Sequence, residues 1–407
     1  MGRVIIIGAG MVGLSTAWHL QERGFEVTVM DREGVAAGSS WGNAGWLTPA
    51  KTLPLADPLL WKYGARTLFD VDSPLHMPMR IDRKLWLFLA RFMAHATTTR
   101  WDTTLRDLTP ISQVALAAFD ELQAGGVDEI THKKPFIIGF EDESQSTGFL
   151  REVEAVRQHG QQVDMTRLDN SGDFVPMLSD EVPIAYRMEG QRFIEPGPYV
   201  DALARSVKER GGQIRTGAEV THVAAGDKPA VLFADGSREE ADKVVIATGA
   251  WLPRLAATHG VSTMVQAGRG YSFSVATEIP AQHSLYLPHH RMACTPYQGR
   301  FRIAGTMEFR GPDEPLDPKR IRAIINQASR LMQGIDFEDR QDEWVGSRPV
   351  TTDGKPLVGQ TTARDIFVAG GHGMWGIVLG PATGKYLAQL MDTGVTHPAI
   401  APFNPLR

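Results

Sequence analysis

The stretch Val4-Ile5-Ile6-Ile7-Gly8-Ala9-Gly10-Met11-Val12-Gly13 decides the fold of this chain. Its first four residues form an apolar run typical of a buried parallel strand. Gly8, Gly10 and Gly13 then spell G-x-G-x-x-G where this strand turns into a helix, which is predicted over residues 11–23. In a dinucleotide-binding unit the first glycine permits the tight turn, the second lets a pyrophosphate approach the backbone, and the third lets helix and strand pack closely. The N-terminus of the helix favours the phosphates through its free N–H groups and its dipole.

A second strand and an acidic residue complete this unit. Gly24 ends the helix, residues 26–30 are predicted as a strand, and Asp31 follows that strand. An acid about 20 residues past the glycines is the expected acceptor for a ribose 2′-hydroxyl. A lone G-x-G-x-x-G is weak evidence, but here the strand, the helix, the second strand and the acid stand in order. The pattern therefore favours nucleotide binding over a glycine-rich turn.

Composition bounds the remaining possibilities. A chain of 407 residues is too long for one core, so two or three domains are expected. The net charge of −5 argues against a nucleic-acid binder, whose affinity would come from neutralising phosphates. Cys294 is the only cysteine, which excludes an internal disulfide framework and suits a reducing compartment. No signal-peptide pattern and no apolar run of about 20 residues occur, so a cytoplasmic protein is predicted.

The chain does not continue as a regular alternation of strands and helices after Asp31. A Gly/Ser-rich stretch covers residues 38–45, and a proline-rich segment follows it. Short strands with a hairpin turn at Asp235-Gly236 are predicted between residues 214 and 233. Helices are predicted at residues 85–93, 111–123, 199–210, 316–334 and 381–391.

Two further stretches carry weaker nucleotide signals. Residues 244–249 form a buried strand that ends in Ala-Thr-Gly, where small side chains let a cofactor lie against the backbone. Another strand ends in Gly370-Gly371-His372-Gly373, before a helix-like segment at residues 376–380. Backbone N–H groups at such a turn can stabilise an anion, and a reduced flavin carries negative charge. The three signals recur in the order and spacing that a flavoprotein needs.

These motifs resemble those of the D-amino acid dehydrogenase group within the flavin-dependent amino-acid oxidase superfamily, which also holds glycine and sarcosine oxidases. The resemblance spans nearly the whole chain, and SSWGNAG with the GHG block is fairly specific to this group. The stretches that carry it are VIIIGAGMVGLSTAWHL, VTVMDRE, SSWGNAG, IEPGPYVDAL, GAEVTHV, VVIATGAW, GRGYSFS, SRPVTTDGKPLVG and VAGGHGMWGIVLGPATG.

The resemblance implies a two-domain fold. One domain would have a doubly wound, Rossmann-like α/β fold, would bind FAD, and would be assembled from residues 1–48, 195–265 and 340–407. The other would be an α+β substrate domain with an antiparallel sheet over the flavin, built from residues 49–194 and 266–339.

The resemblance also implies FAD rather than NAD, with Val220 against the adenine and Asn43, Ala44 and Gly45 along the flavin ring or ribityl chain. No cysteine falls in the C-terminal flavin block, so the FAD is expected to be non-covalent. Beside Gly8, Gly10, Gly13 and Asp31, the residues expected at the cofactor are Met11, Val12, Arg32, Ser39, Ser40, Asn43, Ala44, Gly45, Val220, Thr248, Gly249, Trp251, Gly371, Gly373, Met374, Gly376 and Ile377.

The family chemistry moves a hydride from the substrate α-carbon to flavin N5, so the protein mainly has to orient an amino acid. Arg348 matches the family's carboxylate-binding arginine, where a guanidinium fork pairs with a carboxylate better than lysine does. Tyr271 matches a strand that lines the substrate cavity, Tyr286 is a further candidate in that cavity, and His372 matches the loop beside the flavin. Tyr297 is a further candidate of the same kind, and for each of these tyrosines the competing interpretation is a buried core residue.

Several alternatives stay open at this stage. The same motifs serve a dehydrogenase that passes electrons to a quinone or carrier and an O₂-using oxidase of glycine or sarcosine. A non-enzymatic flavoprotein leaves Arg348 without a role, and an NAD-dependent dehydrogenase leaves the second and third nucleotide signals unexplained. No metal site is expected, because the pair His289-His290 has no third ligand in sight.

A quinone or carrier as electron acceptor would require contact with a lipid surface. Residues 53–63 and 83–93 each join large apolar side chains and a tryptophan to basic residues, as interfacial anchors do. They are candidates for peripheral association with the inner face of the membrane. The competing interpretation is that both segments are core helices of the substrate domain.

Overall fold

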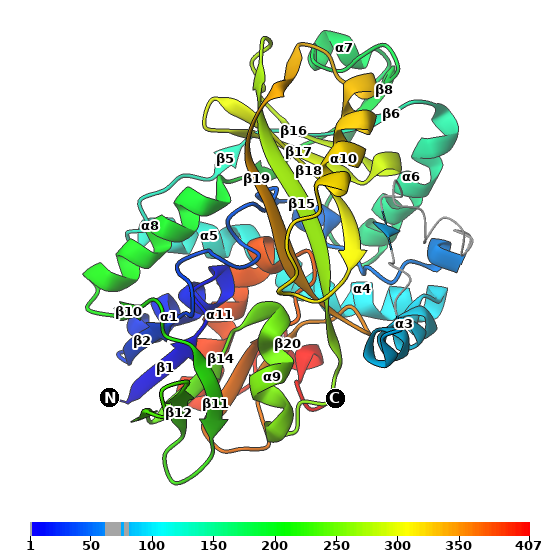
Figure 1. Cartoon of the computed structure of the whole chain (residues 1–407). Coiled ribbons are helices and arrows are strands. Elements are labelled where there is room, and N and C mark those ends of the chain that lie inside the picture. The colour runs from blue at the N-terminus through cyan, green and yellow to red at the C-terminus, as the bar shows by residue number, and fades with distance from the viewer. Residues whose placement is uncertain (1, 62–74, 77–80) are drawn as a thin grey trace.

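The computed structural model describes residues 2–61, 75–76 and 81–407, and two large β-sheets organise it (Figure 1). The first sheet lies near both termini. The second is built around two long neighbouring strands that run from the first sheet into the upper part of the molecule.

The first sheet has six strands, and its centre is the apolar strand that opens the chain. The strand order is β10-β2-β1-β14-β21-β20, and all neighbours are parallel except β21 and β20. This is the doubly wound, Rossmann-like sheet that the sequence predicts. Its strands are β1 (Arg3–Ile7), β2 (Glu26–Met30), β10 (Gln213–Arg215), β14 (Lys243–Ile246), β20 (Leu357–Gln360) and β21 (Ile366–Gly370).

Elements from distant parts of the chain cover both faces of this sheet. Ile6 on one face packs with residues of α1 (Met11–Glu22), α8 (Pro196–Glu209) and α11 (Gly376–Thr393) in one apolar core. On the other face Ile5 and Ile7 pack with α9 (Leu252–Ala256) and with a three-stranded sheet. That sheet consists of β11 (Val220–Ala224), β12 (Ala230–Phe233) and β13 (Arg238–Glu240), with Asp235-Gly236 in the turn between β12 and β13.

Two helices differ from the prediction by more than three residues at one end. The helix predicted over residues 111–123 is two helices, α4 (Thr98–Gln113) and α5 (Ala115–Ala124), which meet at Val114. The last helix begins at Gly376 rather than at Pro381, so Pro381 lies inside the helix, where close packing around the helix can offset the one backbone hydrogen bond that a proline cannot donate. Close packing is present here, since a Cβ at Gly384 would collide with the backbone of α1 at Ser15.

The second sheet is mostly antiparallel and has nine strands. Its order is β19-β15-β18-β17-β16-β6-β8-β7, with β4 paired to β18 and with parallel pairs only at β16–β6 and β18–β4. The helix α10 (Pro318–Leu331) covers part of one face. Its strands are β4 (Leu75–His76), β6 (Phe136–Phe140), β7 (Met165–Leu168), β8 (Ile184–Met188), β15 (Val265–Thr277), β16 (Ser284–Leu287), β17 (Met292–Tyr297), β18 (Arg300–Phe309) and β19 (Ile335–Thr351).

Shorter elements connect these layers. The strands β3 (Trp46–Leu47), β9 (Arg192–Phe193) and β5 (His132–Lys133) form a small fourth sheet. The remaining helices are α3 (Arg83–His95), α6 (Glu143–Gln158) and α7 (Ser171–Phe174). Single 3₁₀ turns are η1 (Pro49–Lys51), η2 (Pro58–Trp61), η3 (Gly249–Trp251), η4 (Ala257–His259), η5 (Pro288–His290) and η6 (Ala401–Phe403).

The division of the chain into five segments remains a proposal, and the composition of the sheets supports most of it. The first sheet draws strands from residues 1–48, 195–265 and 340–407. Helices α4 and α5 fall in the segment expected in the substrate domain, yet Leu108 and Phe119 pack in the core beneath the first sheet. Part of the segment 49–194 thus packs with the first sheet, before the expected return of the chain at residue 195.

Candidate active site

The glycine-rich turn after β1 has the geometry that its sequence predicts. Gly8 has a φ of +115°, and a Cβ there would overlap the carbonyl of Ala247 on the neighbouring strand. A Cβ at Gly13 would overlap the Gly8 carbonyl, which confirms that Gly13 permits close packing of helix on strand. At Gly10, by contrast, an added Cβ would meet only the Ser40 hydroxyl, at 3.2 Å. Gly10 therefore is not needed for the packing of α1 against β1, and its missing side chain leaves space beside the N-terminus of α1.

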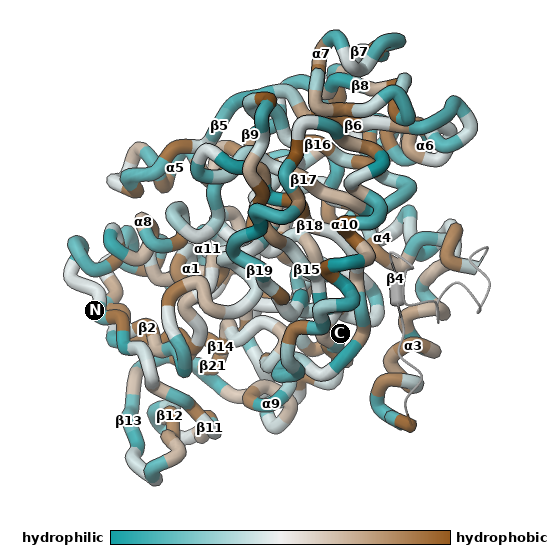
Figure 2. The backbone as a smooth tube through the Cα atoms, turned by 45° about the horizontal axis from the view of Figure 1, so that its top comes forward, coloured by the Kyte–Doolittle hydropathy of each residue, from teal (hydrophilic) through white to brown (hydrophobic). Residues whose placement is uncertain are grey.

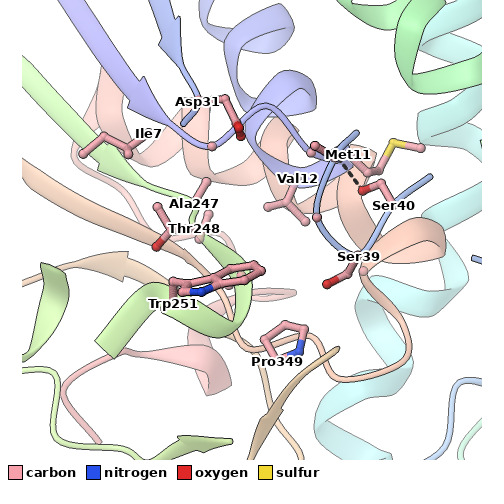
Figure 3. Close-up of a pocket in the computed structure, with 18 of the residues that line it drawn as sticks. Ile7, Met11, Val12, Asp31, Ser39, Ser40, Ala247, Thr248, Trp251 and Pro349 are labelled. Atoms are coloured by element: carbon pink, nitrogen blue, oxygen red, sulfur yellow. Dashed lines mark hydrogen bonds between the residues drawn. The ribbon is translucent and has the colours of Figure 1, made fainter. Parts of the chain in front are cut away.

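Asp31 at the end of β2 holds this turn in place. Its Oδ2 accepts a hydrogen bond from the backbone N–H of Ala9 at 2.9 Å, and its Oδ1 accepts from the N–H groups of Glu33 and Gly34. Ser40 contributes a second link, since its Oγ accepts from the backbone N–H of Met11 at 3.2 Å (Figure 3). The first turn of α1 and the segment around Ser40 are thereby fixed to each other.

A large cavity opens between this turn and the ends of β14 and β21. Figure 3 shows Met11 and Val12 on one side and Trp251 and Pro349 on the other. The predicted cofactor residues that line the cavity are Gly8, Gly10, Met11, Val12, Asp31, Arg32, Ser39, Ser40, Asn43, Val220, Thr248, Gly249, Trp251, Gly373, Met374, Gly376 and Ile377. The three sequence signals thus meet at one site, although they lie hundreds of residues apart.

Four predicted cofactor residues lie outside the lining of this cavity. Gly13 is behind the glycine turn, and Ala44 lines a second, adjoining cavity. Gly45 and Gly371 have φ values of +72° and +69°, so they shape the backbone around the site. A Cβ at Gly45 would overlap the carbonyl of Ile194.

One wall of the cavity contains a cluster that the sequence did not reveal. Arg32 lies over the Trp251 ring at 4.3 Å, and both donate hydrogen bonds to Asp313, which lies between β18 and α10. Arg254, one helical turn after Trp251, also pairs with Asp313. Residues lining the cavity without having been predicted include Gly38, Glu219, Thr221, Arg254 and Pro349. Only their adjacency to predicted residues could have suggested them.

The residues of this cavity fit a dinucleotide such as FAD. Thr248 carries a buried Oγ1 that has no hydrogen-bond partner among the described residues, and it lines the cavity at the end of β14. Gly10 leaves room for a phosphate beside the N-terminus of α1, whose dipole favours negative charge there. The cavity therefore offers polar groups, space and a favourable field together.

His372 lines the same cavity as a neutral side chain. It is 3% exposed, and its Nε2 lies 2.9 Å from Oγ1 of Thr383. Burial lowers the pKa of His372 to about 4. The imidazole is consequently uncharged at neutral pH.

A second cavity of about 410 Å³ adjoins the first. Asn43, Arg348 and Met374 line both cavities and so mark the junction between them. The second cavity is mainly apolar, as small-molecule sites usually are, and polar and charged side chains also line it.

Arg348 on β19 places a cation at this junction. Its Nη1 donates a hydrogen bond to the Thr306 carbonyl at 3.2 Å, and the guanidinium lies directly against Gly270, where any Cβ would overlap it. Among the described residues no carboxylate pairs with Arg348, and burial lowers the pKa of its guanidinium to about 10. It remains charged at neutral pH and lacks a counter-ion, which is the condition for binding an anionic ligand.

Aromatic and charged groups also line the second cavity. Tyr286 lines it, as expected of a substrate-cavity residue, and packs edge-on against Trp46 with ring centroids 5.3 Å apart. Lys51 there forms an ion pair with Glu152, and burial raises the pKa of Asp57.

Tyr271 does not lie in this cavity, which corrects the expectation from the sequence. It is fully buried among the apolar residues beneath α10, and its hydroxyl donates to Glu308. Alternate residues of a strand face opposite sides, so an error of one position along β15 reverses the assignment. Tyr297 also lies outside both cavities, with the Arg302 guanidinium 4.0 Å from its ring centroid.

The structure also places the two adjacent histidines and the single cysteine. His289 lines the second cavity, whereas the Nε2 of His290 lies 2.7 Å from Oε1 of Glu141. Within residues 2–61, 75–76 and 81–407, no cluster of three or more His, Cys, Asp or Glu side chains is arranged to hold a metal ion. Cys294 is fully buried in the core beneath α10, as expected of a small apolar side chain, and burial raises the pKa of its thiol.

The fold and the paired cavities define a dinucleotide-dependent oxidoreductase with an adjoining small-molecule site. Comparison with known proteins gives the family. Residues 3–390 match the family model described as DAO, FAD dependent oxidoreductase, and the chain belongs to that family. The protein is therefore an FAD-dependent oxidoreductase, and FAD is the cofactor that the first cavity fits.

Individual relatives agree with this assignment. The D-amino acid dehydrogenase of Xylella fastidiosa (strain M23) is 29% identical over 400 residues, covering 96% of this chain and 92% of the relative. Glycine oxidase from Geobacillus kaustophilus has a similar structure, with a TM-score of 0.75, 24% identity, and coverage of 100% of this chain and 99% of that one. L-proline dehydrogenase from P. horikoshii has a TM-score of 0.71 at 18% identity, covering 100% of this chain and 97% of that one. The two structures show the shared fold.

Proposed function

We propose that the protein oxidises D-amino acids to 2-oxo acids with FAD as the immediate electron acceptor. The observation that carries this proposal is the position of Arg348. A partly buried guanidinium without a carboxylate partner among the described residues lines both cavities. It would hold the α-carboxylate so that the α-carbon lies at the junction with the flavin cavity.

The chemistry asks little acid–base work of the protein. The α-carbon loses its hydrogen with two electrons as a hydride, the neutral amine becomes an iminium cation, and water then hydrolyses the iminium to ammonium and the 2-oxo acid. FAD supplies the two-electron acceptor for this step. The chain binds the carboxylate through Arg348 and surrounds the reacting carbon with the apolar wall of the second cavity. His372 stays neutral and polar beside the flavin cavity.

The size of the second cavity favours amino acids that carry a side chain. A volume of about 410 Å³ is much more than glycine or sarcosine fills. The lining of the cavity is mainly apolar, which suits aliphatic or aromatic side chains. The relative named D-amino acid dehydrogenase supports the same substrate class.

The test is a substrate screen on purified holoenzyme. D- and L-enantiomers of alanine, leucine and phenylalanine, with glycine and sarcosine as controls, would be added anaerobically, and bleaching of the flavin spectrum would be followed. We expect bleaching with the D-enantiomers. Bleaching only by L-enantiomers would overturn the stereochemical part of the proposal, and bleaching only by glycine or sarcosine would favour an amine oxidase.

Reoxidation of the reduced enzyme from this screen identifies the electron acceptor. We propose that electrons pass to a quinone or other carrier rather than to O₂. Reduced enzyme should therefore reoxidise faster with a soluble quinone than with air-saturated buffer. Rapid reoxidation by O₂ with stoichiometric hydrogen peroxide would identify an oxidase.

An apolar surface beside α3 supports contact with a membrane. Large apolar side chains on α3 and in the segments before it are exposed, with Trp61 63% and Trp86 44% exposed, as are Leu59, Ile81 and Leu87; the Trp61 indole N–H donates to the Ala96 carbonyl just after α3. The brown segments of α3 in Figure 2 lie at the edge of the molecule. Lys62 and Tyr63, the last residues of the first candidate segment, lie outside the described residues. No helix in the described part of the chain is long and apolar enough to cross a bilayer, so the proposed contact is peripheral.

Co-sedimentation with anionic liposomes tests this contact. We expect wild-type protein to pellet with lipid. The variants Trp61→Ser and Trp86→Ser should each pellet to a smaller extent. Ile130→Ser is the matched control, because Ile130 is 53% exposed and lies away from α3 in the sequence. Equal pelleting of wild type with and without lipid would leave both segments as ordinary protein surface.

A further inference from the structure

The strand beside Arg348 has an irregularity at Thr306. Arg269 and Tyr271 of β15 are two residues apart, while their partners on β18, Glu308 and Gly305, are three residues apart. The extra residue makes a β-bulge, a device that bends a strand and re-aims a side chain, often beside active sites.

Thr306 has an uncommon backbone conformation for its residue type. Its φ is +58°, in the left-handed region that glycine occupies readily and that β-branched residues rarely adopt. A glycine would relieve this strain, so a threonine here points to a use for its side chain.

The two polar atoms of Thr306 differ in their surroundings. Its carbonyl accepts the 3.2 Å hydrogen bond from Nη1 of Arg348, whereas its Oγ1 is buried and has no hydrogen-bond partner among the described residues. Thr306 is 4% exposed and lines the second cavity together with Arg348. An unpaired buried hydroxyl is costly unless a ligand satisfies it.

We infer that Thr306 is a substrate-binding residue whose hydroxyl donates a hydrogen bond to the carboxylate held by Arg348. The bulge lies where the Thr306 carbonyl contacts the guanidinium, Thr306 and Arg348 line the same cavity, and Gly270 on β15 leaves the space that the guanidinium occupies. The carbonyl would orient Arg348, and the hydroxyl would add a donor that a carboxylate can use. This inference rests on the proposed function, because it assumes that the substrate carries a carboxylate.

The test compares Thr306→Val with Thr306→Ser in purified holoenzyme. Valine keeps the shape and the branching of the side chain but removes the hydroxyl, while serine keeps the hydroxyl. Sodium propionate, a carboxylate that lacks the amine and cannot be oxidised by this reaction, would be titrated while the visible spectrum of the flavin is recorded. A second readout is the propionate-dependent rise in melting temperature.

We expect Thr306→Val to raise the Kd for propionate about tenfold, the factor for loss of one hydrogen bond to a charged group, and Thr306→Ser to raise it less than threefold. The Kd for FAD should be unchanged in both variants. Equal affinity for propionate in Thr306→Val and wild type would overturn the inference, and so would equal weakening in both variants.

Failure of the inference can be told apart from failure of the proposed function. If no amino acid bleaches the flavin but propionate binding depends on the Thr306 hydroxyl, the carboxylate site stands and the substrate assignment falls. If D-amino acids bleach the flavin while propionate binding ignores the hydroxyl, the function stands and Thr306 has only a backbone role.

Discussion

The hydroxyl of Tyr271 lies 2.8 Å from Oε2 of Glu308, and this hydrogen bond joins β15 to β18 inside the protein. Both residues are completely buried, and burial together with the Glu308 carboxylate raises the pKa of the phenol. Arg310 pairs with the other Glu308 oxygen, so the carboxylate is held by two groups. The link stabilises the strand pair that carries the Thr306 bulge.

Tyr271→Phe should therefore act on stability rather than on substrate binding. Removing one hydrogen bond to a buried carboxylate should lower the free energy of unfolding by about 1–3 kcal/mol. Urea unfolding of the holoenzyme measures this change, and KM for the substrate should stay within about twofold of wild type. A large rise in KM without loss of stability would place Tyr271 at the substrate after all.

Arg348→Ala should abolish most turnover while leaving the cofactor bound. Loss of a partly buried charge pair typically costs about 2–5 kcal/mol, which corresponds to a fall in kcat/KM of about 30-fold to several thousand-fold. Arg348→Lys should recover only part of this loss, because lysine lacks the guanidinium fork. Steady-state kinetics with the flavin content of each variant provide the check, and a change of less than about tenfold in Arg348→Ala would place the carboxylate anchor elsewhere.

Two glycines of the first turn offer a matched pair of substitutions. Gly10→Ala adds a methyl group that meets only Ser40, so the variant should fold but bind FAD more weakly. Gly13→Ala forces the methyl group into the Gly8 carbonyl and should lower the melting temperature even without FAD. Flavin fluorescence titration and thermal unfolding of the apoprotein separate the two effects. The opposite ranking would contradict the assigned roles.

FAD should leave the protein intact when the chain is denatured. Cys294 is buried beneath α10 and lines neither cavity, and it is the only cysteine of the chain. Acid precipitation should therefore leave the yellow colour in the supernatant as FAD, identified by chromatography. Colour retained in the washed pellet would indicate a covalent link to another residue type.

The buried His372 should make the protein less stable in mild acid. Its pKa is about 4 in the folded protein, against an ordinary value of 6.5. As pH falls below 6.5 the unfolded chain binds the proton first, so the free energy of unfolding decreases until pH 4 is passed. Through His372 alone, the free energy of unfolding should fall by about 2 kcal/mol between pH 7 and pH 5.

Urea titrations at pH 7 and pH 5 measure this loss, and His372→Asn should reduce it. His19 serves as the internal reference, because burial lowers its pKa to about 3 and its contribution is the same in wild type and variant. An unchanged pH dependence in His372→Asn would mean that other groups govern the acid sensitivity.

The sequence predicted the cofactor-binding side of the molecule well, and the reason is local. Gly8, Gly10 and Asp31 act through backbone geometry within one strand–turn–helix unit, so their spacing alone carries the information. The ends of β14 and β21 were recognisable because their small residues must lie where a cofactor meets the backbone. The cavity joins these stretches as expected.

The substrate-binding residues were less predictable, because their positions depend on which face of a strand each side chain occupies and on how neighbouring strands are paired. The Tyr271 side chain points to one face of β15, and the register of β15 and β18 shifts between Arg269 and Tyr271. Such a shift changes which residues face the same side of the sheet, so simple alternation along the sequence does not predict it. Thr306 belongs to no recognisable motif, and only its φ value and its unpaired hydroxyl distinguish it. The contacts of Asp313 with Arg32 and Trp251 join residues about 280 and 60 positions apart, which no local pattern reports.

The order of strands in the first sheet has a consequence for biosynthesis. β1 is made first, but its neighbour β14 ends at residue 246 and the next strand, β21, ends at residue 370. A chain that stops before residue 366 therefore has the glycine-rich turn and five of the six strands, but lacks β21 and α11. Because residues at the end of β21 and the start of α11 line the first cavity, the complete cofactor cavity exists only after both elements have been synthesised.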